Sequence, residues 1–391
     1  MDLRIEMMER LGKKESLVAL CREYGISRKT GEKFKARFKL RGVAGLADAS
    51  RAPLVIPHRT PPEMVELILA ERRAHPSWGA KKLKTVLEKR LQRPFPAVST
   101  MGDLLARHGL VARRKRRMPG DYGPRITLRE ANAPNEIWCV DYKGQFRLGN
   151  KSLCYPLTVT DQHSRFILGC EGMAAISGDE SREVFEELFR RYGVPESMRS
   201  DNGTPFSSTG LGNLSKLSVY WMLLGIRLER IRPGCPQENG RHERMHRTLK
   251  FETARPGRTN LLQQQESFDN FVEEFNHVRP HEALDMKVPA EVYLPSSRAY
   301  PEKLAEFSYD DYDDTLRVGR SGKLNVVGRG LVHLSEALAG RDVGVRELRD
   351  GRLLFAFGSL ELAHLGSGTR ITPIKRLSET DTAEVSPMCP V

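Results

Sequence analysis

Residues 236–250 read Pro-Gln-Glu-Asn-Gly-Arg-His-Glu-Arg-Met-His-Arg-Thr-Leu-Lys, and the interpretation of the whole chain depends on this stretch. Its first residues favour a loop and its later residues favour a helix. On a helix, Glu243, Arg247 and Lys250 are spaced i, i+4 and i+7 and therefore share one face. One acid beside two cations suits a site that holds a metal ion next to a phosphodiester. The alternative is an ordinary Glu–Arg pair, worth only about 0.2–0.5 kcal/mol.

The composition favours a basic, multidomain protein. The chain has 391 residues, which at roughly 100–200 residues per domain corresponds to about two to four domains. Lys and Arg total 63 against 50 Asp and Glu, which gives a formal net charge of +13. This excess favours a polyanionic partner, most often nucleic acid. The alternative is a basic charge that serves only solubility.

Cysteine usage and hydropathy indicate in which cellular compartment the protein is expected. The cysteines show no Cys-x-x-Cys spacing, which argues against a zinc knuckle and a disulfide framework and fits a reducing cytosol. No secretory signal is recognisable, and no apolar run approaches the ~18 residues of a membrane span. We therefore expect a soluble intracellular protein. The six cysteines are Cys21, Cys139, Cys154, Cys170, Cys235 and Cys389.

Residues 15–39 predict a helix-turn-helix unit. An amphipathic helix with apolar Leu20 and Cys21 breaks at Gly25, and Ser27 supplies the N-cap of a second helix. The second helix is rich in Lys and Arg, and a recognition helix presents cations of this kind to phosphates and base edges in the major groove. A generic helical hairpin with a solvated basic face is the alternative. The expected DNA-binding residues are Arg28, Lys29, Lys33 and Arg37.

A second helical unit follows a proline-containing linker at residues 46–61. Pro62 opens one helix, Gly79 begins another, and Ser99 caps a third that Gly109 ends. The third helix takes the recognition position, with Ser99 and Thr100 expected on DNA. Five consecutive cations come next, and they form either a solvated tail or a contact along a phosphate backbone. They are Arg113, Arg114, Lys115, Arg116 and Arg117.

From Asn135 onward the pattern changes to short strands mixed with helices. The order is three strands, a helix, a strand, a helix, a strand and the helix of the opening stretch. Such an order predicts an α/β layer in which acids at strand ends face a common edge. The strand candidates are residues 137–142, 153–160, 166–170, 197–200 and 226–231, and the helix candidates are residues 180–192 and 214–224.

Two of these strands end at an aspartate, Asp141 and Asp201. Phosphodiester cleavage without a protein nucleophile uses two divalent ions roughly 3.5–4 Å apart. Mg²⁺ takes hard oxygen ligands and keeps several waters, so two or three carboxylates suffice. We predict that Asp141 bridges both ions, with Asp201 and Glu243 each completing one. Arg247 and Lys250 would contact DNA phosphate near the scissile bond.

Each carboxylate has an alternative reading. Asp141 is otherwise a strand-end acid on solvent, and Asp201 otherwise forms an Asx-turn in Asp-Asn-Gly. Glu238 competes with Glu243 for the third position, and Asp161 competes because it too follows a strand.

Three blocks of sequence carry a family resemblance: residues 138–141, 200–206 and 236–250. With them, the chain resembles bacterial insertion-sequence transposases of the DDE class, whose catalytic core is similar to retroviral integrase. Matching the Asn-Gly-x-x-Glu-Arg pattern puts the third acid at Glu243 rather than Glu238. It also gives Arg247 and Lys250 the positions of the family's DNA-contacting cations. Residues 275–293 resemble the segment that closes such cores, so the resemblance covers about residues 10–295.

The resemblance implies a ribonuclease H-like fold that uses Mg²⁺, or Mn²⁺ as a substitute, at two ions per active site. It implies nicking of the element's ends in double-stranded DNA, followed by strand transfer into target DNA. It also implies a homodimer or higher oligomer on paired ends, in a bacterial cytoplasm and associated with the nucleoid. The spacing from Asp201 to Glu243 exceeds the family's tightest pattern, which implies a longer loop near residues 207–213.

The remaining sequence predicts a small C-terminal β-barrel. Short Gly-punctuated strands follow an acidic segment at residues 307–314. In the resembled family such a domain often contacts DNA or the neighbouring protomer, and a stability cap is the alternative. The expected domains are a helix-turn-helix unit (1–52), a second such unit with the basic linker (53–118), the ribonuclease H-like core (119–298), the barrel (299–375) and a disordered tail (376–391).

Two other functions compete with transposition. One is a catalytically silent DNA-binding regulator, against which all three acids and both helix cations weigh. The other is a ribonuclease H-type nuclease on RNA–DNA hybrids, against which the duplicated helix-turn-helix units weigh because they favour duplex DNA.

Overall fold

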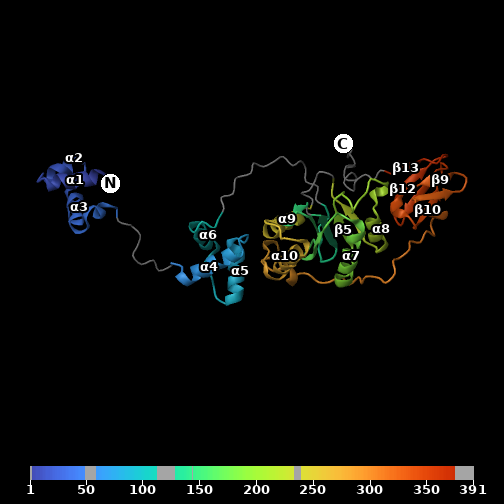
Figure 1. Ribbon diagram of the computed structural model, residues 1–391, viewed down its shortest axis with the longest axis horizontal. Helices are drawn as coiled ribbons and strands as arrows, with labels where there is room; N and C mark the ends of the chain where they lie inside the picture. The colour runs from blue at the N-terminus through green and yellow to red at the C-terminus, as the bar shows by residue number, and fades with distance from the viewer. Residues whose placement is uncertain (1, 49–58, 112–127, 143, 233–238, 375–391) are drawn as a thin grey trace, which may run out of the picture. The chain divides into compact units, whose positions relative to one another are not determined.

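The structure is a computed structural model that describes residues 2–48, 59–111, 128–142, 144–232 and 239–374 (Figure 1). The chain divides into two compact units, Met1–Pro61 and Pro62–Val391. The predicted basic run at residues 113–117, the competing acid Glu238 and the predicted tail at residues 376–391 lie outside the described residues. None of the helices within the described ranges is long and apolar enough to span a membrane.

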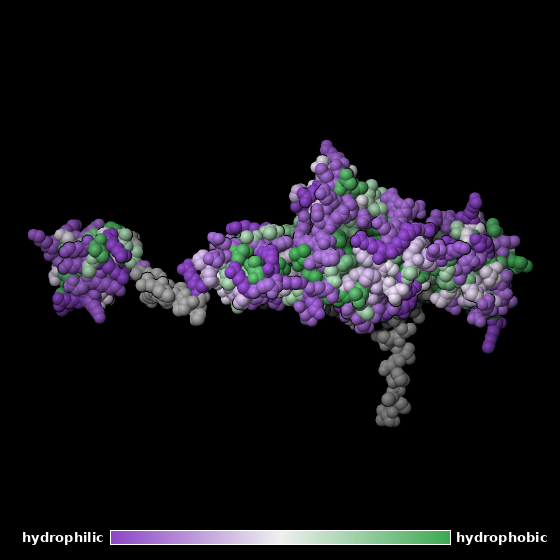
Figure 2. All heavy atoms as spheres, turned by 90° about the horizontal axis from the view of Figure 1, so that it is seen from below, coloured by the Kyte–Doolittle hydropathy of each residue, from purple (hydrophilic) through white to green (hydrophobic). Residues whose placement is uncertain are grey.

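The first unit contains the predicted helical pair. Ser27 caps the second helix, since its Oγ accepts a hydrogen bond from the backbone N–H of Thr30 at 3.1 Å. Gly25 takes a φ of +63° in the turn, a conformation that glycine adopts without steric cost. The helices are α1 (Asp2–Gly12), α2 (Leu17–Glu23) and α3 (Arg28–Arg41), followed by the 3₁₀ turn η1 (Gly42–Leu46). The side of this unit seen in Figure 2 is mainly hydrophilic.

Gly31 sets how closely α2 and α3 approach each other. A Cβ at this position would lie 2.4 Å from Cys21 Sγ and 3.3 Å from Leu17 Cδ1. We therefore expect Gly31→Ala to destabilise the first unit by about 1–3 kcal/mol through overpacking. Amide hydrogen exchange of this unit would measure the loss. Gly102→Ala is the control, because no atom lies within 4 Å of its added Cβ. That change should stabilise α6 by up to about 1 kcal/mol, and equal protection in both variants would contradict the close approach.

Three further helices open the second unit. They are α4 (Pro62–Ala74), α5 (Ala80–Leu91) and α6 (Val98–Arg107), which pack around the fully buried Trp78. Ser99 is not the N-cap of α6, because the helix already begins at Val98 with Ala97 before it and no side-chain cap. The buried Met101 and Leu105 set the phase of this helix, and packing therefore outweighs the capping signal.

This helical group contacts the core that follows it through ion pairs. His75 Nδ1 lies 3.1 Å from Glu274 Oε1, and Lys81 Nζ lies 3.0 Å from Glu282 Oε2. Arg279 also donates from Nη2 to Ser77 Oγ at 3.2 Å. The loop between α4 and α5 therefore lies against the segment after the last core helix.

The core is built on a mixed sheet with β1 (Ile137–Tyr142) near its centre. β1 pairs antiparallel with β3 on one side and parallel with β5 on the other. β3 also pairs with β2 and β4, and β5 pairs parallel with β6. The predicted succession of elements is confirmed, with the short β2 added. The other strands are β2 (Phe146–Arg147), β3 (Leu153–Asp161), β4 (Ile167–Met173), β5 (Ser197–Ser200) and β6 (Arg227–Arg230).

Helices cover both faces of this sheet, so the core has three layers. α7 (Gly178–Tyr192) and α8 (Lys216–Leu223) pack on one face, where Trp138 and Val140 of β1 are buried. α9 (Gly240–Thr253) and α10 (Leu261–Glu273) lie together on the other face and bury side chains of β3 and β4. Side chains alternate along a strand, so Asp141 lies on the α9 face. The chain continues through the short helices η4 (Glu274–Val278), η5 (Glu282–Leu284) and η6 (Pro289–Glu291).

The C-terminal region is β-rich as predicted, but the closed barrel is not confirmed. Its five-stranded antiparallel sheet has the open order β13-β12-β11-β10-β7, and β8 and β9 form a separate hairpin with the short helix η7 (Glu336–Leu338) after it. Within the described residues the hairpin strands pair only with each other, so they do not bridge β7 to β13. The strands are β7 (Asp314–Arg317), β8 (Lys323–Val326), β9 (Gly330–His333), β10 (Asp342–Glu347), β11 (Leu353–Phe357), β12 (Leu360–Leu365) and β13 (Ile371–Pro373).

The long loop between Asp201 and α8 has a packing role. Its 3₁₀ turn η2 (Leu211–Asn213) lies against β12, where a Cβ on Gly212 would approach Leu362 to 3.2 Å. Four side chains of the loop and α8 enter the apolar core of the C-terminal sheet. The extra loop residues inferred from the Asp201–Glu243 spacing therefore join the two regions. The four side chains are Leu211, Leu214, Val219 and Leu223.

Candidate active site

Asp141 and Asp201 stand at the ends of neighbouring parallel strands. Cys139 of β1 pairs with Arg199 of β5, and continuing that register by two residues sets Asp141 opposite Asp201. Residues opposite each other in adjacent strands extend to the same face of the sheet. Both carboxylates therefore lie at one edge on the α9 face, and the Asp141 side chain is 29% exposed.

Asp201 makes the Asx-turn that its sequence also suggested. Its Oδ1 accepts a hydrogen bond from the Gly203 backbone N–H at 3.0 Å. Among the described residues, Oδ2 accepts no hydrogen bond. The turn thus fixes the carboxylate and leaves one oxygen for a ligand. Two half-exposed carboxylates at one sheet edge are hard oxygen donors that fit Mg²⁺, which supplements protein ligands with water.

Two buried histidines of α9 lie over the strand that carries Asp141. His246 Nδ1 lies 3.5 Å from Asp141 Oδ2, and its Nε2 is 2.6 Å from Thr158 Oγ1. His242 joins Thr158 through Nε2 at 2.8 Å and Thr160 through Nδ1 at 2.8 Å. The Thr158 hydroxyl also donates to the Asp141 carbonyl oxygen at 3.0 Å. This polar network fixes β1, β3 and α9 relative to one another beneath the carboxylate.

The face of α9 that carries Glu243, Arg247 and Lys250 is exposed, as the helical spacing predicts. Its opposite face buries His242, Met245, His246 and Leu249. Within the described residues, no three His, Cys, Asp or Glu side chains lie close enough together to hold a metal ion. Asp141 and Asp201 thus follow from neighbouring strands of the sheet, and their joint use with Glu243 as metal ligands stays a prediction.

Asp161, the competing strand-end acid, has a structural role. It is 1% exposed, and its Oδ1 accepts from the Asn135 backbone N–H at 2.7 Å. Its Oδ2 accepts from the Ser164 N–H at 2.7 Å and from the Ser164 hydroxyl at 2.6 Å. Burial raises the pKa of Asp161, and these donors oppose that shift. The carboxylate holds the β3–β4 turn together.

The predicted DNA-binding residues lie on three different helices. Arg28, Lys29 and Lys33 are exposed on α3, where Arg37 is half-buried. Ser99 and Thr100 are exposed in the first turn of α6. Their contacts with DNA stay predictions. Arg247 and Lys250 are exposed on α9, and the cations at residues 113–117 lie outside the described residues.

Comparison with known families and proteins fits this geometry. Two family profiles described as "Integrase core domain" match residues 131–236 and 224–289. The chain is 27% identical over 201 residues to an insertion element IS407 protein of Burkholderia multivorans, covering 51% of this chain and 69% of the relative. It is 26% identical over 257 residues to an insertion element IS476 protein of Xanthomonas euvesicatoria, covering 64% of this chain and 70% of that relative. Both relatives are described as uncharacterized. These matches support an insertion-sequence transposase with a retroviral integrase-like core.

The transposase is therefore a DNA-processing enzyme. A profile described as "Homeodomain-like domain" matches its residues 30–105, which cover most of α3, all of α4 and α5, and most of α6. Among solved structures, it is similar to the HTLV-2 integrase catalytic core domain in complex with magnesium. That similarity has 15% identity and a TM-score of 0.34, and it covers 42% of the transposase and all of the integrase chain.

His242 and His246 are the residues of the transposase site that sequence reasoning missed. Their i, i+4 spacing on α9 was a visible signal, since residues four apart share a helix face. Both are nearly inaccessible, at 2% and 1% exposure. His246 contacts the Asp141 carboxylate, and both histidines contact Thr158 of β3.

We expect His246→Leu to lower metal-dependent nicking by about 10–100-fold, because a carboxylate without its outer partner binds metal less well. The Mg²⁺ concentration for half-maximal rate should rise, whereas a change in folding alone would lower the rate at every Mg²⁺ concentration. A Mg²⁺ titration of nicking measures both quantities. Met245→Leu, one residue away in the same buried layer, is the control. An unchanged Mg²⁺ requirement in His246→Leu would show that the contact has no positioning role.

Proposed function

We propose that this transposase binds the terminal repeats of its own mobile element, nicks their 3′ ends and transfers those ends into target DNA. The observation that carries this proposal is the Asp141–Asp201 pair at adjacent strand ends beneath α9. The integrase-core match over the same residues supports it. In this proposal residues 119–298 catalyse, and the units at residues 1–52 and 53–118 recognise duplex DNA through α3, α6 and the basic run at residues 113–117.

Asp141, Asp201 and Glu243 would hold two Mg²⁺ ions, for which Mn²⁺ could substitute. When bound there, the ions supply activation of a water or 3′-hydroxyl nucleophile and stabilisation of the departing oxygen. The Gly203 N–H orients the Asp201 carboxylate, and His246 orients that of Asp141. Arg247 and Lys250 hold the phosphate backbone beside the reacting bond through charge-assisted hydrogen bonds.

The partners are the element's two ends and a target duplex. We propose a homodimer or higher homo-oligomer assembled on paired ends, in the bacterial cytoplasm in association with the nucleoid. The net charge of +13 supports binding to a polyanion. Because phosphate contacts release counterions, affinity should fall steeply with salt. A flat salt response in a titration would contradict the DNA-binding role of the basic helices.

The deciding experiment is nicking and strand transfer with Mg²⁺ on DNA that carries the element's own ends. Wild type is compared with Glu243→Gln and Glu238→Gln at matched DNA affinity. Loss of chemistry only in Glu243→Gln supports the three carboxylates as proposed. Loss only in Glu238→Gln moves the third ligand to Glu238.

Two other outcomes would replace the proposed function. Binding without cutting, with Mn²⁺ also tried, would indicate a silent DNA-binding regulator. Preferential cleavage of an RNA–DNA hybrid over duplex DNA would indicate a ribonuclease H-type nuclease.

A further inference from the structure

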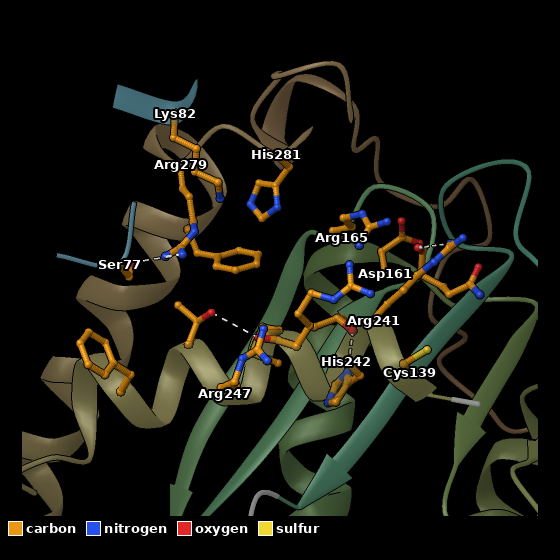
Figure 3. A pocket seen from close by; sticks show the side chains of 17 residues that line it. Ser77, Lys82, Cys139, Asp161, Arg165, Arg241, His242, Arg247, Arg279 and His281 are labelled. Carbon is orange, nitrogen blue, oxygen red and sulfur yellow. Dashed lines mark hydrogen bonds between the residues drawn. The ribbon is translucent and has the colours of Figure 1, made fainter. Parts of the chain in front are cut away.

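A cavity of about 460 Å³ lies beside α9 (Figure 3). Its size falls within the about 300–1,000 Å³ of pockets that bind organic ligands. Four segments far apart in the sequence form its walls: the α4–α5 region, the β3–β4 turn, α9 and the segment after α10. In Figure 3 Lys82 and Arg279 lie on one side of the opening, with Arg165 and Arg241 on the other. His281 lies between them.

The cavity wall is strongly basic. Among the described residues that line the cavity, Asp161 is the one acidic residue, and its carboxylate already accepts hydrogen bonds from Asn135 and Ser164. Two of the cations have carboxylate partners, since Arg241 pairs with Glu130 at 3.0 Å and Arg279 pairs with Glu252 at 3.1 Å. The lining cations are Lys82, Arg165, Arg241, Arg244, Arg247 and Arg279.

Among the described residues, the other four cations have no carboxylate partner. Within the part of the chain that the structure describes, no carboxylate lies within 4.0 Å of Lys82, Arg165, Arg244 or Arg247. The Nε of Arg165 is buried and has no hydrogen-bond partner among the described residues. Buried polar groups are nearly always satisfied in folded proteins, so such an exception suggests a bound partner.

The crowding of positive charge also affects protonation. Burial, together with Arg241 and Arg244, lowers the pKa of Arg165. Burial and Arg279 lower the pKa of Lys82 to about 8. Burial and Lys82 lower the pKa of His281 to about 3, so His281 is neutral and adds no charge to the cavity. An anion in the cavity would stabilise the charged forms of Lys82 and Arg165.

Arg165 is presented by a constrained turn. It follows the Asp161–Ser164 hydrogen bonds and has a φ of +64°, which is uncommon for residues other than glycine. Left-handed conformations of this kind often mark functional positions. The turn directs the Arg165 guanidinium, which has no ion-pair partner in the described part of the chain, into the cavity, where Figure 3 shows it near Arg241.

The cavity shares one residue, Arg247, with the exposed face of α9 that carries Glu243. At 3.6 residues per turn, Arg241, Arg244 and Thr248 form one stripe, and Glu243, Arg247 and Lys250 form another about 120° away around the helix, with Arg244 and Arg247 about 60° apart between them. Arg247 belongs to the second stripe and also lines the cavity. A strand whose phosphate lies beside Glu243 can therefore continue past Arg247 into the cavity.

We propose that this cavity binds the phosphodiester backbone of one strand of the element-end DNA, next to the phosphate that is cut. The Arg guanidinium groups match phosphate oxygens in geometry as well as charge. Such contacts position the strand without reading its sequence. Lys82 belongs to α5 of the second helical unit and also lines the cavity. That unit and the core would therefore contact the same DNA strand. This inference rests on the proposed function and names the route of its substrate.

The first test measures affinity in full-length Asp201→Asn protein, which we expect to bind DNA without cutting it. Arg165→Asn and Arg244→Gln are combined, because Asn tolerates the left-handed conformation at position 165. Binding to a labelled duplex that carries the element's end is measured by anisotropy across a salt series. We expect about tenfold weaker binding or more, and a salt slope lower by about two. The control combines Arg182→Gln and Arg190→Gln on α7, whose exposed side chains pair with Glu186, and its binding should not change.

The second test needs no substitution in the cavity. Lys82 should be acetylated readily, since a pKa of about 8 leaves much of its amine unprotonated near pH 8. Mass spectrometry then follows its acetylation with and without the element-end duplex. We expect DNA to slow acetylation of Lys82 by about tenfold or more, because the bound strand covers the amine. Exposed Lys216 at the start of α8 should react equally in both conditions.

The outcomes separate this inference from the proposed function. If the double variant binds like the control and DNA leaves Lys82 acetylation unchanged, the cavity does not hold DNA. Protection by inorganic pyrophosphate but not by DNA would make it a small-anion site and also overturn the proposal. Nicking by wild type without Lys82 protection retains the function and removes the inference. Protection of Lys82 by DNA without nicking retains the DNA contact in the cavity and removes the proposed catalytic function.

Discussion

Asp201→Asn is expected to lower nicking and strand transfer by about 1,000-fold while leaving DNA affinity within about twofold. The amide removes a negative charge and an oxygen of the proposed metal ligand, and groups that stabilise transition-state charge are typically worth about 10²–10³ in rate. The Asx-turn should survive, because the Asn side-chain oxygen can still accept from Gly203. Both quantities are measured on the same element-end duplex, by product formation with Mg²⁺ and by anisotropy without it.

Asp179→Asn is the matched control for this change. Asp179 is an exposed acid in the first turn of α7, on the face of the sheet opposite α9. Its rate should stay within a factor of about two. Metal-dependent nicking by Asp201→Asn at the wild-type rate would mean that the carboxylates at the β1–β5 edge are not the metal ligands.

Glu229→Ala is expected to lower the free energy of unfolding of the core by about 3–5 kcal/mol. Glu229 on β6 pairs with Arg199 of β5 at 2.7 Å, and the Arg199 side chain is only 2% exposed. Arg199 also donates to the Arg129 carbonyl oxygen at 2.6 Å. Removing the carboxylate leaves a buried guanidinium with an unbalanced charge, two residues before Asp201. Urea unfolding of the full chain, followed by tryptophan fluorescence, reports on the core.

Two further variants test the cause of this loss. Arg199→Met combined with Glu229→Leu removes both charges and should cost less than Glu229→Ala alone. Arg227→Ala breaks an exposed pair with Glu196, so its effect should stay within about 1 kcal/mol. If the double variant is as unstable as the single one, the unpaired charge is not the reason.

Local sequence signals were sufficient for the elements and for part of the site. The Ser27 cap and the Gly25 turn lie within a few residues of the helices they define, and both are as predicted. Asp141 and Asp201 were predicted as ligands because acids at the ends of neighbouring strands meet at one edge, and that role stays a prediction. Ser99 was wrongly placed as a cap because the buried face of α6, rather than the capping residue, determined where the helix starts.

Features that depend on distant pairs could not be read from the sequence. The roles of His242 and His246 require knowing that Thr158 of β3 lies beneath α9. The basic cavity gathers side chains from segments as far apart as Ser77 and Arg279, which are separated by 202 positions. Strand propensity located the C-terminal strands but not their pairing, so the barrel closure did not follow. The histidine contacts, the cavity and the strand pairing all depend on which helices and strands become neighbours in the fold.

The shared apolar cluster between the η2–α8 region and the C-terminal sheet constrains how such chains can diverge. Leu211 and Leu214 of the catalytic region are as much part of the C-terminal core as Leu362 is. A recombination event that exchanged only the C-terminal domain between relatives would pair each sheet with a foreign loop. Viable exchanges must carry residues 207–224 and the C-terminal sheet together. The segment that must be exchanged as one piece therefore begins inside the catalytic region, rather than at the domain boundary that the linear order of domains suggests.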